Sequence, residues 1–306
     1  MTAHPAPTPL LPQLAALGRD IKLSHTVFAL PFAVLGAVLA ATYRGVGLSM
    51  GEIILVLACM VLARTFAMTF NRLADAALDA QNPRTQNRAV ASGRVSRQVA
   101  LATLGTTALG FIAASGGFAL FYANTWPLFC SPAVLALLAV YSLTKRFTWA
   151  CHLALGLALA ISPVAAALAI CPAYLSQPTP WLIALMVALW VAGFDVIYAL
   201  QDVAVDRAQG LFSMPSRLGE NNALWISRAL HLLSMAALVA AGVASLPLNQ
   251  TFGIATAATA ALLLFEHALV WRSKRNHLNM AFFTVNGIIS LLLGAAGCWD
   301  AWHFSR

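Results

Sequence analysis

The chain has 306 residues, of which 60% are hydrophobic and only 9% are Asp, Glu, Lys or Arg, against about a quarter charged in ordinary soluble domains. This composition, with a mean hydropathy of +0.79, excludes a soluble enzyme and indicates an integral membrane protein. The net charge of +8 could suggest nucleic acid, but the basic residues lie in short loops between apolar segments, where membrane topology accounts for them. We therefore expect no nucleic-acid partner.

The start of the chain differs in composition from the rest. Residues 1–23 begin with a proline-rich stretch and continue with Leu14, Leu17 and Ile21 at helical spacing, which predicts a loose tail followed by a helix at the membrane interface. Residues 24–306 are expected to form one membrane domain. The chain does not start with the charged n-region of a signal peptide, and the first apolar segment is longer than a signal h-region and has no convincing cleavage site, so it is interpreted as a membrane helix.

Nine apolar segments are each long enough to cross a hydrocarbon core as a helix. They are apolar on every side, which excludes the alternating pattern of a membrane β-barrel. Pro132 and Pro163 lie inside two of these segments and are expected to kink the helices without ending them. The predicted spans are approximately 26–43, 51–71, 98–118, 126–143, 151–170, 181–200, 222–244, 252–271 and 278–298.

The basic residues provide a test of this count. Of the 18 Lys and Arg residues, 14 fall in segments on one predicted side of the membrane, two fall on the other side, and Arg64 and Arg228 lie within spans. Basic residues accumulate on the cytoplasmic side, so the amino terminus and the basic loops are predicted to be cytoplasmic and the carboxyl terminus outside. A missed or additional helix would place basic loops on the wrong face.

Half of the ten acidic residues fall in two short windows. Asp75 and Asp79 follow the second span, and Asp195, Asp202 and Asp206 surround the end of the sixth. A charge at membrane depth costs a few kcal/mol on insertion scales, so ionisable groups gathered there point to a function. The alternative is a set of solvated helix ends, which the small number of acids in the chain makes less favoured.

Within each window the polar residues recur at every fourth position, which places them along one face of a continuous helix. The two rows are Asn71, Asp75 and Asp79, and Tyr198, Asp202 and Asp206. The rows are four spans apart, so they enter the same side of the membrane and correspond to equivalent points of a duplicated four-helix unit. We therefore expect the two acidic rows to face each other.

Four carboxylates that face one another would repel unless cations lay between them, and hard oxygen ligands favour Mg²⁺. The following loops supply basic residues, namely Arg84 and Arg88 after the first row and Lys145 and Arg146 after the fourth span. Such side chains bind phosphate oxygens, although each alone could be only a topological marker. The combination predicts a Mg²⁺–diphosphate site.

Three more residues are candidates through their register. Arg64 lies about two helical turns deeper than Asn71 on nearly the same face; it could receive an anionic group of a substrate, or pair with an internal acid or carbonyl. Tyr198 heads the second acidic row, and Tyr141 lies four residues before Lys145. Tyrosines at membrane ends are often interface anchors, but the register of Tyr198 with the acids favours a functional role.

Together these residues resemble the motifs of the UbiA superfamily of membrane prenyltransferases, in the family's order and over essentially the whole chain. The elements are NDxxDxxxD at Asn71, Asp75 and Asp79, YxxxK at Tyr141 and Lys145, and YxxxDxxxD at Tyr198, Asp202 and Asp206. The resemblance implies an all-α fold of about nine transmembrane helices around a central cavity. It also implies transfer of a polyprenyl chain from its diphosphate to an aromatic or other lipophilic acceptor.

The resemblance further implies a role for each site residue. Asp75, Asp79, Asp202 and Asp206, assisted by Asn71, would hold the Mg²⁺ ions that bridge the diphosphate, and Arg84, Arg88 and Lys145 would contact its oxygens. Tyr141 and Tyr198 would lie beside the allylic cation and the acceptor. Arg64 would face the acceptor carboxylate.

The chain departs from the family pattern at two positions. Arg72 stands where the first motif usually has Asp, and Ala89 stands where Pro commonly follows the arginine of the loop. The form NRxxDxxxDxxNPRT, together with HTVFALP from His25 to Pro31, resembles the branch linked to futalosine-route menaquinone synthesis. The expected acceptor is 4-hydroxybenzoate, for ubiquinone, or a dihydroxynaphthoate, for menaquinone, and this pattern favours the second.

Two other classes of function are compatible with acids at membrane depth. A cation-coupled secondary transporter also uses duplicated helices with acids, but its acids lie near the membrane centre and not at helix ends beside arginines. A purely structural membrane subunit would not depend on the acidic rows at all. We expect an enzyme of the bacterial cytoplasmic membrane, with lipid around it.

Overall fold

The computed structural model describes residues 9–21, 27–273 and 281–306. Within these ranges the chain is helical and contains no strand. The helices are α1 (Leu10–Ile21), α2 (Leu30–Arg44), α3 (Met50–Asp79), α4 (Arg97–Tyr122), α5 (Trp126–Val140), α6 (Cys151–Ile170), α7 (Pro178–Ala199), α8 (Val203–Ala208), α9 (Met214–Leu218), α10 (Glu220–Ala244), α11 (Gln250–Ser273) and α13 (Asn286–Phe304). Short 3₁₀ helices cover Tyr141–Arg146 and Pro172–Ser176, and one π-helical turn covers Ala281–Val285.

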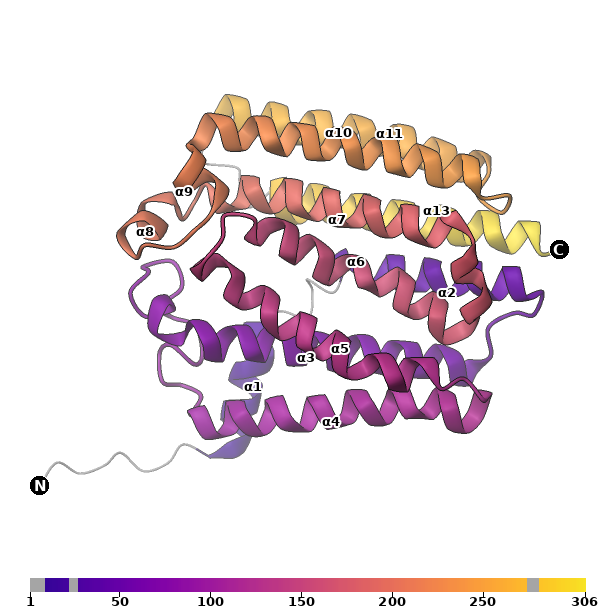
Figure 1. The fold of residues 1–306 in the computed structure, drawn as a ribbon. Coiled ribbons are helices and arrows are strands. Elements are labelled where there is room, and N and C mark those ends of the chain that lie inside the picture. Colours follow the sequence, from indigo (N-terminus) through magenta and orange to yellow (C-terminus); the bar gives the residue numbers. More distant parts are fainter. Residues whose placement is uncertain (1–8, 22–26, 274–280) are drawn as a thin grey trace, which may run out of the picture.

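The predicted all-α membrane fold is confirmed. In the described part of the chain, eight helices are long and apolar enough to cross a membrane, and α2 is a shorter apolar helix. In chain order they form two sets of four, α2–α5 and then α6, α7, α10 and α11, followed by α13 (Figure 1). His25 and the start of the segment predicted at 278–298 lie outside the described residues.

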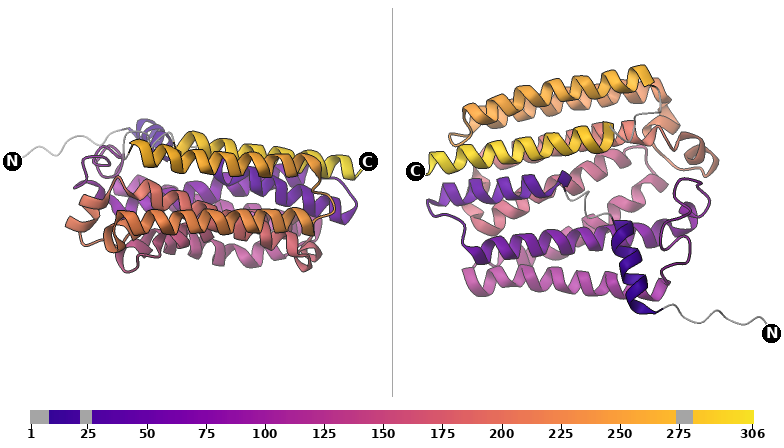
Figure 2. Two further views of the ribbon diagram at one scale, coloured as in Figure 1. Left: turned by 90° about the horizontal axis from the view of Figure 1, so that it is seen from above. Right: turned by 180° about the vertical axis from the view of Figure 1, so that it is seen from behind.

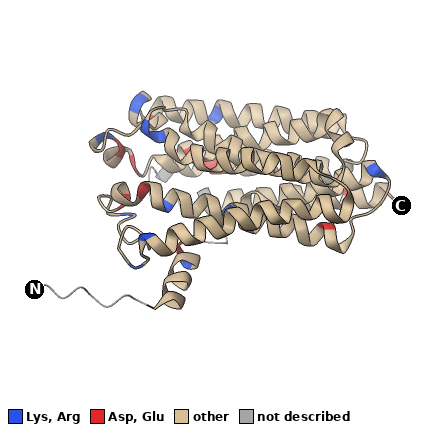
Figure 3. Cartoon of the chain, turned by 60° about the horizontal axis from the view of Figure 1, so that its bottom comes forward, with Lys and Arg blue, Asp and Glu red and all other residues tan. Residues whose placement is uncertain are grey.

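The long helices run side by side, whereas α1 lies across the ends of α3 and α4 (Figure 2). Its buried residues include Leu17 and Ile21, which pack with Ala89 and Val95 of the segment after α3. Lys and Arg gather at the same end of the bundle, where α8, α9 and the loop of residues 80–96 lie (Figure 3). We call this the charged end.

Small residues let α6 approach closely to its two neighbours α2 and α7. An added Cβ on Gly36 of α2 would lie 2.3 Å from the carbonyl oxygen of Pro163, and one on Gly156 of α6 would lie 2.2 Å from that of Ala188 in α7. Such contacts are typical of membrane helix interfaces, where packing replaces the hydrophobic driving force. Pro163 lies inside α6 and Pro132 lies inside α5, and neither residue ends its helix.

A buried polar network joins helices of the second half of the bundle. The Trp190 indole donates to Asn286 at 2.7 Å, and the Asn286 amide donates to Glu266 at 3.0 Å. The His231 and His267 rings are hydrogen-bonded at 3.0 Å. Hydrogen bonds between membrane helices hold them in register, so we interpret these residues as structural.

A salt bridge fixes the turn between α2 and α3 at the opposite end of the bundle. Arg44 Nη1 lies 2.6 Å from Glu52 Oε1, and Glu52, which is 2% exposed, also accepts from the backbone of Ser49 at 2.8 Å. We expect Glu52→Ala to lower the free energy of unfolding by about 1–3 kcal/mol, because it removes the carboxylate partner of Arg44, which keeps only hydrogen bonds to backbone carbonyls, and removes the capping box. Thermal unfolding in detergent measures this loss, with Glu220→Ala at the exposed start of α10 as the control. A loss no larger than that of the control would contradict the prediction.

Candidate active site

The first acidic row lies on one continuous helix. Asn71, Asp75 and Asp79 occupy the last turns of α3, which runs eight residues beyond the predicted end of the second span. The sequence after residue 71 is rich in Ala and Leu and contains no helix breaker before Pro83, so the helix continues. Asp75 and Asp79 are only 1% and 5% exposed, and the predicted spacing along one helical face is confirmed here.

The second acidic row does not lie on one helix, so the expected continuous face is wrong at this point. Tyr198 is in the last turn of α7, which ends at Ala199. The backbone then turns tightly, since the amide of Asp202 bonds to the carbonyl of Ala199 three residues earlier. Asp202 precedes the short helix α8, and Asp206 lies on α8 itself.

Both rows nevertheless line one polar cavity of about 240 Å³ at the charged end. This cavity is lined by every predicted site residue except Arg64 and Arg146. Those residues are Asn71, Asp75, Asp79, Arg84, Arg88, Tyr141, Lys145, Tyr198, Asp202 and Asp206. The bundle therefore brings together three segments that are far apart in the chain.

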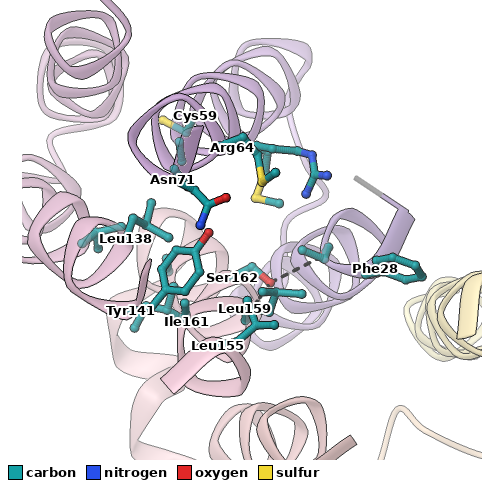
Figure 4. Close-up of a pocket in the computed structure, with 18 of the residues that line it drawn as sticks. Phe28, Cys59, Arg64, Asn71, Leu138, Tyr141, Leu155, Leu159, Ile161 and Ser162 are labelled. Atoms are coloured by element: carbon teal, nitrogen blue, oxygen red, sulfur yellow. Dashed lines mark hydrogen bonds between the residues drawn. The ribbon is translucent and has the colours of Figure 1, made fainter. Parts of the chain in front are cut away.

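A larger and mainly apolar cavity of about 580 Å³ adjoins the polar one. It extends between α3, α4, α5 and α6, and its lining includes Val56, Phe118 and Leu168. Arg64 lines this cavity, and Asn71 and Tyr141 line both. In Figure 4 the side chains of Asn71 and Tyr141 point toward each other across the cavity, and Arg64 extends from the same helix as Asn71.

Most acidic side chains of the polar cavity form salt bridges with Arg or Lys side chains. Asp75 lies 2.7 Å from Lys145 Nζ and 2.9 Å from Arg146 Nη2. Asp79 accepts from Arg88 at 2.8 Å. The side chains that neutralise these buried carboxylates are thus the same ones that are predicted to bind phosphate.

The second row is held differently. Arg84 Nε donates to Asp202 Oδ1 at 2.9 Å, and Arg84 Nη1 donates to the Tyr198 hydroxyl at 3.2 Å. Burial is the largest single influence and lowers the pKa of Arg84, but the hydrogen bond and charge of Asp202, together with Tyr198 and Asp79, outweigh it, so the pKa of Arg84 is raised. Asp206 accepts from the Ser213 hydroxyl at 2.7 Å. Burial, together with the charge of Asp202, raises the pKa of Asp206 despite this bond.

Sequence reasoning did not select several residues that belong to the site. Asp195 lines both cavities and is hydrogen-bonded to His152 at 2.7 Å. Its place in the second acidic window was visible in the sequence, but the partner histidine, 43 residues earlier, gave no signal. Asn82 donates to Asp202 at 3.2 Å and, like Ser213, carries no pattern that distinguishes it from an ordinary loop residue.

The donor set fits Mg²⁺ only together with a phosphate ligand. Among the described residues, no three His, Cys, Asp or Glu side chains are grouped closely enough to hold a metal ion by themselves. Mg²⁺ in proteins is commonly bound through one or two carboxylates, with water and substrate phosphate completing its coordination. The buried carboxylates of two rows around one cavity match that mode.

The fold and cavities define an all-α membrane protein in which a polar cavity at one end of the bundle adjoins a larger apolar cavity. The model of the UbiA prenyltransferase family matches residues 29–299. The chain belongs to this family, and it is a prenyltransferase.

Relatives and solved structures agree with this assignment. The chain is 27% identical to the 4-hydroxybenzoate octaprenyltransferase of Chromohalobacter salexigens, over 76% of this chain and 75% of the relative. It matches the apo structure of a UbiA homologue from Aeropyrum pernix with a TM-score of 0.79 and 32% identity, over 90% and 97% of the two chains. A UbiA homologue from Archaeoglobus fulgidus, bound to GPP and Mg²⁺, shares the fold at 18% identity and a TM-score of 0.68, over 93% and 99%.

Proposed function

We propose that this protein transfers a polyprenyl group from polyprenyl diphosphate to an aromatic carboxylic acid during synthesis of a respiratory quinone, with Mg²⁺ as cofactor. The observation that carries this proposal is the junction of the two cavities. A polar cavity lined by the two acidic rows and by three basic side chains adjoins an apolar cavity of about 580 Å³. That arrangement suits a diphosphate head and an isoprenoid tail in one molecule.

The four carboxylates Asp75, Asp79, Asp202 and Asp206 would hold Mg²⁺, and Asn71 lies beside the first of them. Bound Mg²⁺ supplies charge stabilisation to the departing diphosphate. The metal-bound A. fulgidus homologue provides a precedent for this cofactor in the same fold.

The basic residues of the cavity would bind the diphosphate by exchanging partners. Arg84, Arg88 and Lys145 each pair with an acid of the rows. If these acids held a metal ion, the basic side chains would be available to phosphate oxygens, with which arginine forms bidentate bonds. Positive charge around the departing group stabilises the transition state in which its bond to the allylic carbon breaks.

The tyrosines and the apolar cavity would control the reacting carbon. Tyr141 lines both cavities, as does Tyr198, so both lie where the diphosphate head would meet the prenyl chain. Their electron-rich rings stabilise a nearby cation. The apolar walls exclude water, which would otherwise consume the allylic cation before the aromatic acceptor attacks it.

Arg64 is proposed to bind the carboxylate of the acceptor, because it lines the apolar cavity and is absent from the lining of the polar one. We expect Arg64→Ala to raise the KM for the acceptor about 10- to 100-fold, the usual scale of a charge-assisted hydrogen bond. The KM for the prenyl diphosphate should change much less. Arg228→Ala is the control, since Arg228 stacks on Trp225 and Trp271. An equal rise in both KM values would assign Arg64 to structure or to phosphate binding.

The identity of the acceptor is tested by competition. Purified protein in detergent receives Mg²⁺, a polyprenyl diphosphate, and equal amounts of 4-hydroxybenzoate and a dihydroxynaphthoate, and the products are identified by mass. A prenylated naphthoate supports a role in menaquinone synthesis, and a prenylated hydroxybenzoate supports ubiquinone synthesis. The absence of a Mg²⁺-dependent product with either acid would contradict the proposed acceptor class.

The alternative of a cation-coupled transporter has no support in the structure. The acidic rows lie at one end of the bundle beside arginines, and the chain belongs to a prenyltransferase family. From the concentration of basic residues we propose that the charged end faces the cytoplasm of a bacterium. The quinone precursor would then be made at the inner surface of the membrane.

A further inference from the structure

The side chain of Asp20, near the end of α1, contacts both positions at which the first motif and its loop depart from the family pattern. Asp20 Oδ2 accepts from Arg72 Nε at 3.1 Å and from the backbone amide of Ala89 at 3.1 Å. Proline has no amide hydrogen, so the second bond requires a residue other than proline at position 89. An aspartate at position 72 would instead face Asp20 with a like charge. The residues at the two departing positions, Arg72 and Ala89, thus donate to the same carboxylate oxygen.

Arg72 connects Asp20 to the candidate active site. Its Nη1 donates to Asn71 Oδ1 at 2.8 Å, and Asn71 Nδ2 donates to Asp75 Oδ2 at 3.2 Å. These two neighbours fix the orientation of the Asn71 amide. If the amide were flipped, its NH₂ group would face a guanidinium donor and its oxygen would face a carboxylate acceptor. The Asn71 oxygen is therefore engaged by Arg72 and directed away from Asp75.

Asp20 also helps α1 to hold the loop of residues 80–96, which carries Arg84 and Arg88. The bond to Ala89 lies in the middle of this loop. At the end of the loop, the backbone amide of Ser96 donates to Gln13 Oε1 of α1 at 2.8 Å. The loop is thus attached to α1 at two points, and the first of them, Ala89, directly follows Arg88 in the chain.

We propose that Asp20 is a positioning residue for the diphosphate site. Through Arg72 it sets Asn71 as a hydrogen-bond donor to Asp75 and not as an oxygen ligand of the metal. Through Ala89 it holds the loop that presents Arg84 and Arg88. This inference rests on the proposed function. It gives α1 a role in positioning the site residues, in addition to its predicted place at the membrane interface.

The test measures binding of a non-reacting polyprenyl thiolodiphosphate by calorimetry at a series of Mg²⁺ concentrations. We expect Asp20→Asn and Arg72→Gln each to weaken Mg²⁺-dependent binding about 10- to 100-fold, the range typical of residues that orient metal ligands. The double variant should be no weaker than the weaker single variant, because both changes break one connection. Arg19→Gln, an exposed neighbour on α1, is the control and should bind as the unaltered protein does.

A second measurement tests the hold on the loop without any ligand. Limited digestion with trypsin should cut the loop after Arg84 and Arg94 faster in Asp20→Asn and Ala89→Pro than in Arg19→Gln. Cleavage after Arg88 is left out of the comparison, because trypsin does not cut before a proline at position 89. The thermal midpoints of the three variants should stay within a few degrees of one another. Additive losses in the double variant, unaltered Mg²⁺-dependent binding, or unaltered cleavage would overturn the inference. If the unaltered protein itself binds no thiolodiphosphate with Mg²⁺, the proposed function fails instead.

Discussion

Replacing Asp75 or Asp202 by alanine is expected to lower kcat by about a thousandfold, with the protein still folded. Each substitution removes one carboxylate from the set proposed to hold Mg²⁺, and loss of one preorganised electrostatic contact commonly costs 10²–10³ in kcat. Asp75→Ala also leaves Lys145 and Arg146 beside each other without the acid that both of them contact. The measurement is product formation at saturating Mg²⁺ and prenyl diphosphate, with the thermal midpoint as the check on folding.

Asp300→Asn is the matched control for these acid substitutions. Asp300 is also a buried acid, but it accepts from the backbone amides of Asn249 and Phe252 at the start of α11 and lines neither cavity. We expect this variant to lose thermal stability and to keep its turnover per folded molecule. Turnover retained by Asp75→Ala or Asp202→Ala would remove that residue from the proposed metal site.

Gly156→Ala is expected to impair folding, although it adds a single methyl group. The new Cβ would lie 2.2 Å from the carbonyl oxygen of Ala188 and 3.0 Å from its carbon. These are backbone atoms and cannot rotate away, so α6 and α7 must separate. Overpacking of this kind commonly costs about 1–3 kcal/mol. The shift would also move α7, which carries Asp195 and Tyr198.

Gly105→Ala provides the comparison, because nothing lies within 4 Å of a Cβ added at that position in α4. Alanine has the higher helix propensity, so this variant should be as stable as the unaltered protein or slightly more so. Yield of monodisperse protein and the thermal midpoint in detergent measure both effects. Equal midpoints for the two variants would show that the α6–α7 interface is not packed as described.

The two acidic rows show what the sequence could predict and where it failed. Both have the same four-residue spacing, and the same helical face was expected of each. In the first row the helix continues to Asp79, which confirms the prediction. In the second row the helix ends at Ala199, where no proline or glycine marks the break. A change from helix to turn leaves the residue spacing unaltered, so the pattern alone could not reveal it.

Contacts between segments that are distant in the chain could not be predicted from the sequence either. Asp20 and Arg72 are 52 residues apart, and His152 and Asp195 are 43 apart, so no local periodicity joins them. The apolar spans, in contrast, follow from composition over about 20 residues, and the fold was predictable to that extent. The clustering of acids at two helix ends likewise pointed to the cavity, because so few acids are present.

The most direct test of the account is a crystal structure of the protein with Mn²⁺ in place of Mg²⁺ and a non-reacting polyprenyl thiolodiphosphate. Anomalous scattering locates the metal ions directly. We predict metal peaks in the polar cavity, within coordination distance of carboxylates from both acidic rows, with the diphosphate against Arg84, Arg88 and Lys145 and the prenyl chain in the apolar cavity. A diphosphate bound elsewhere, or metal ions that contact neither acidic row, would contradict the proposed site.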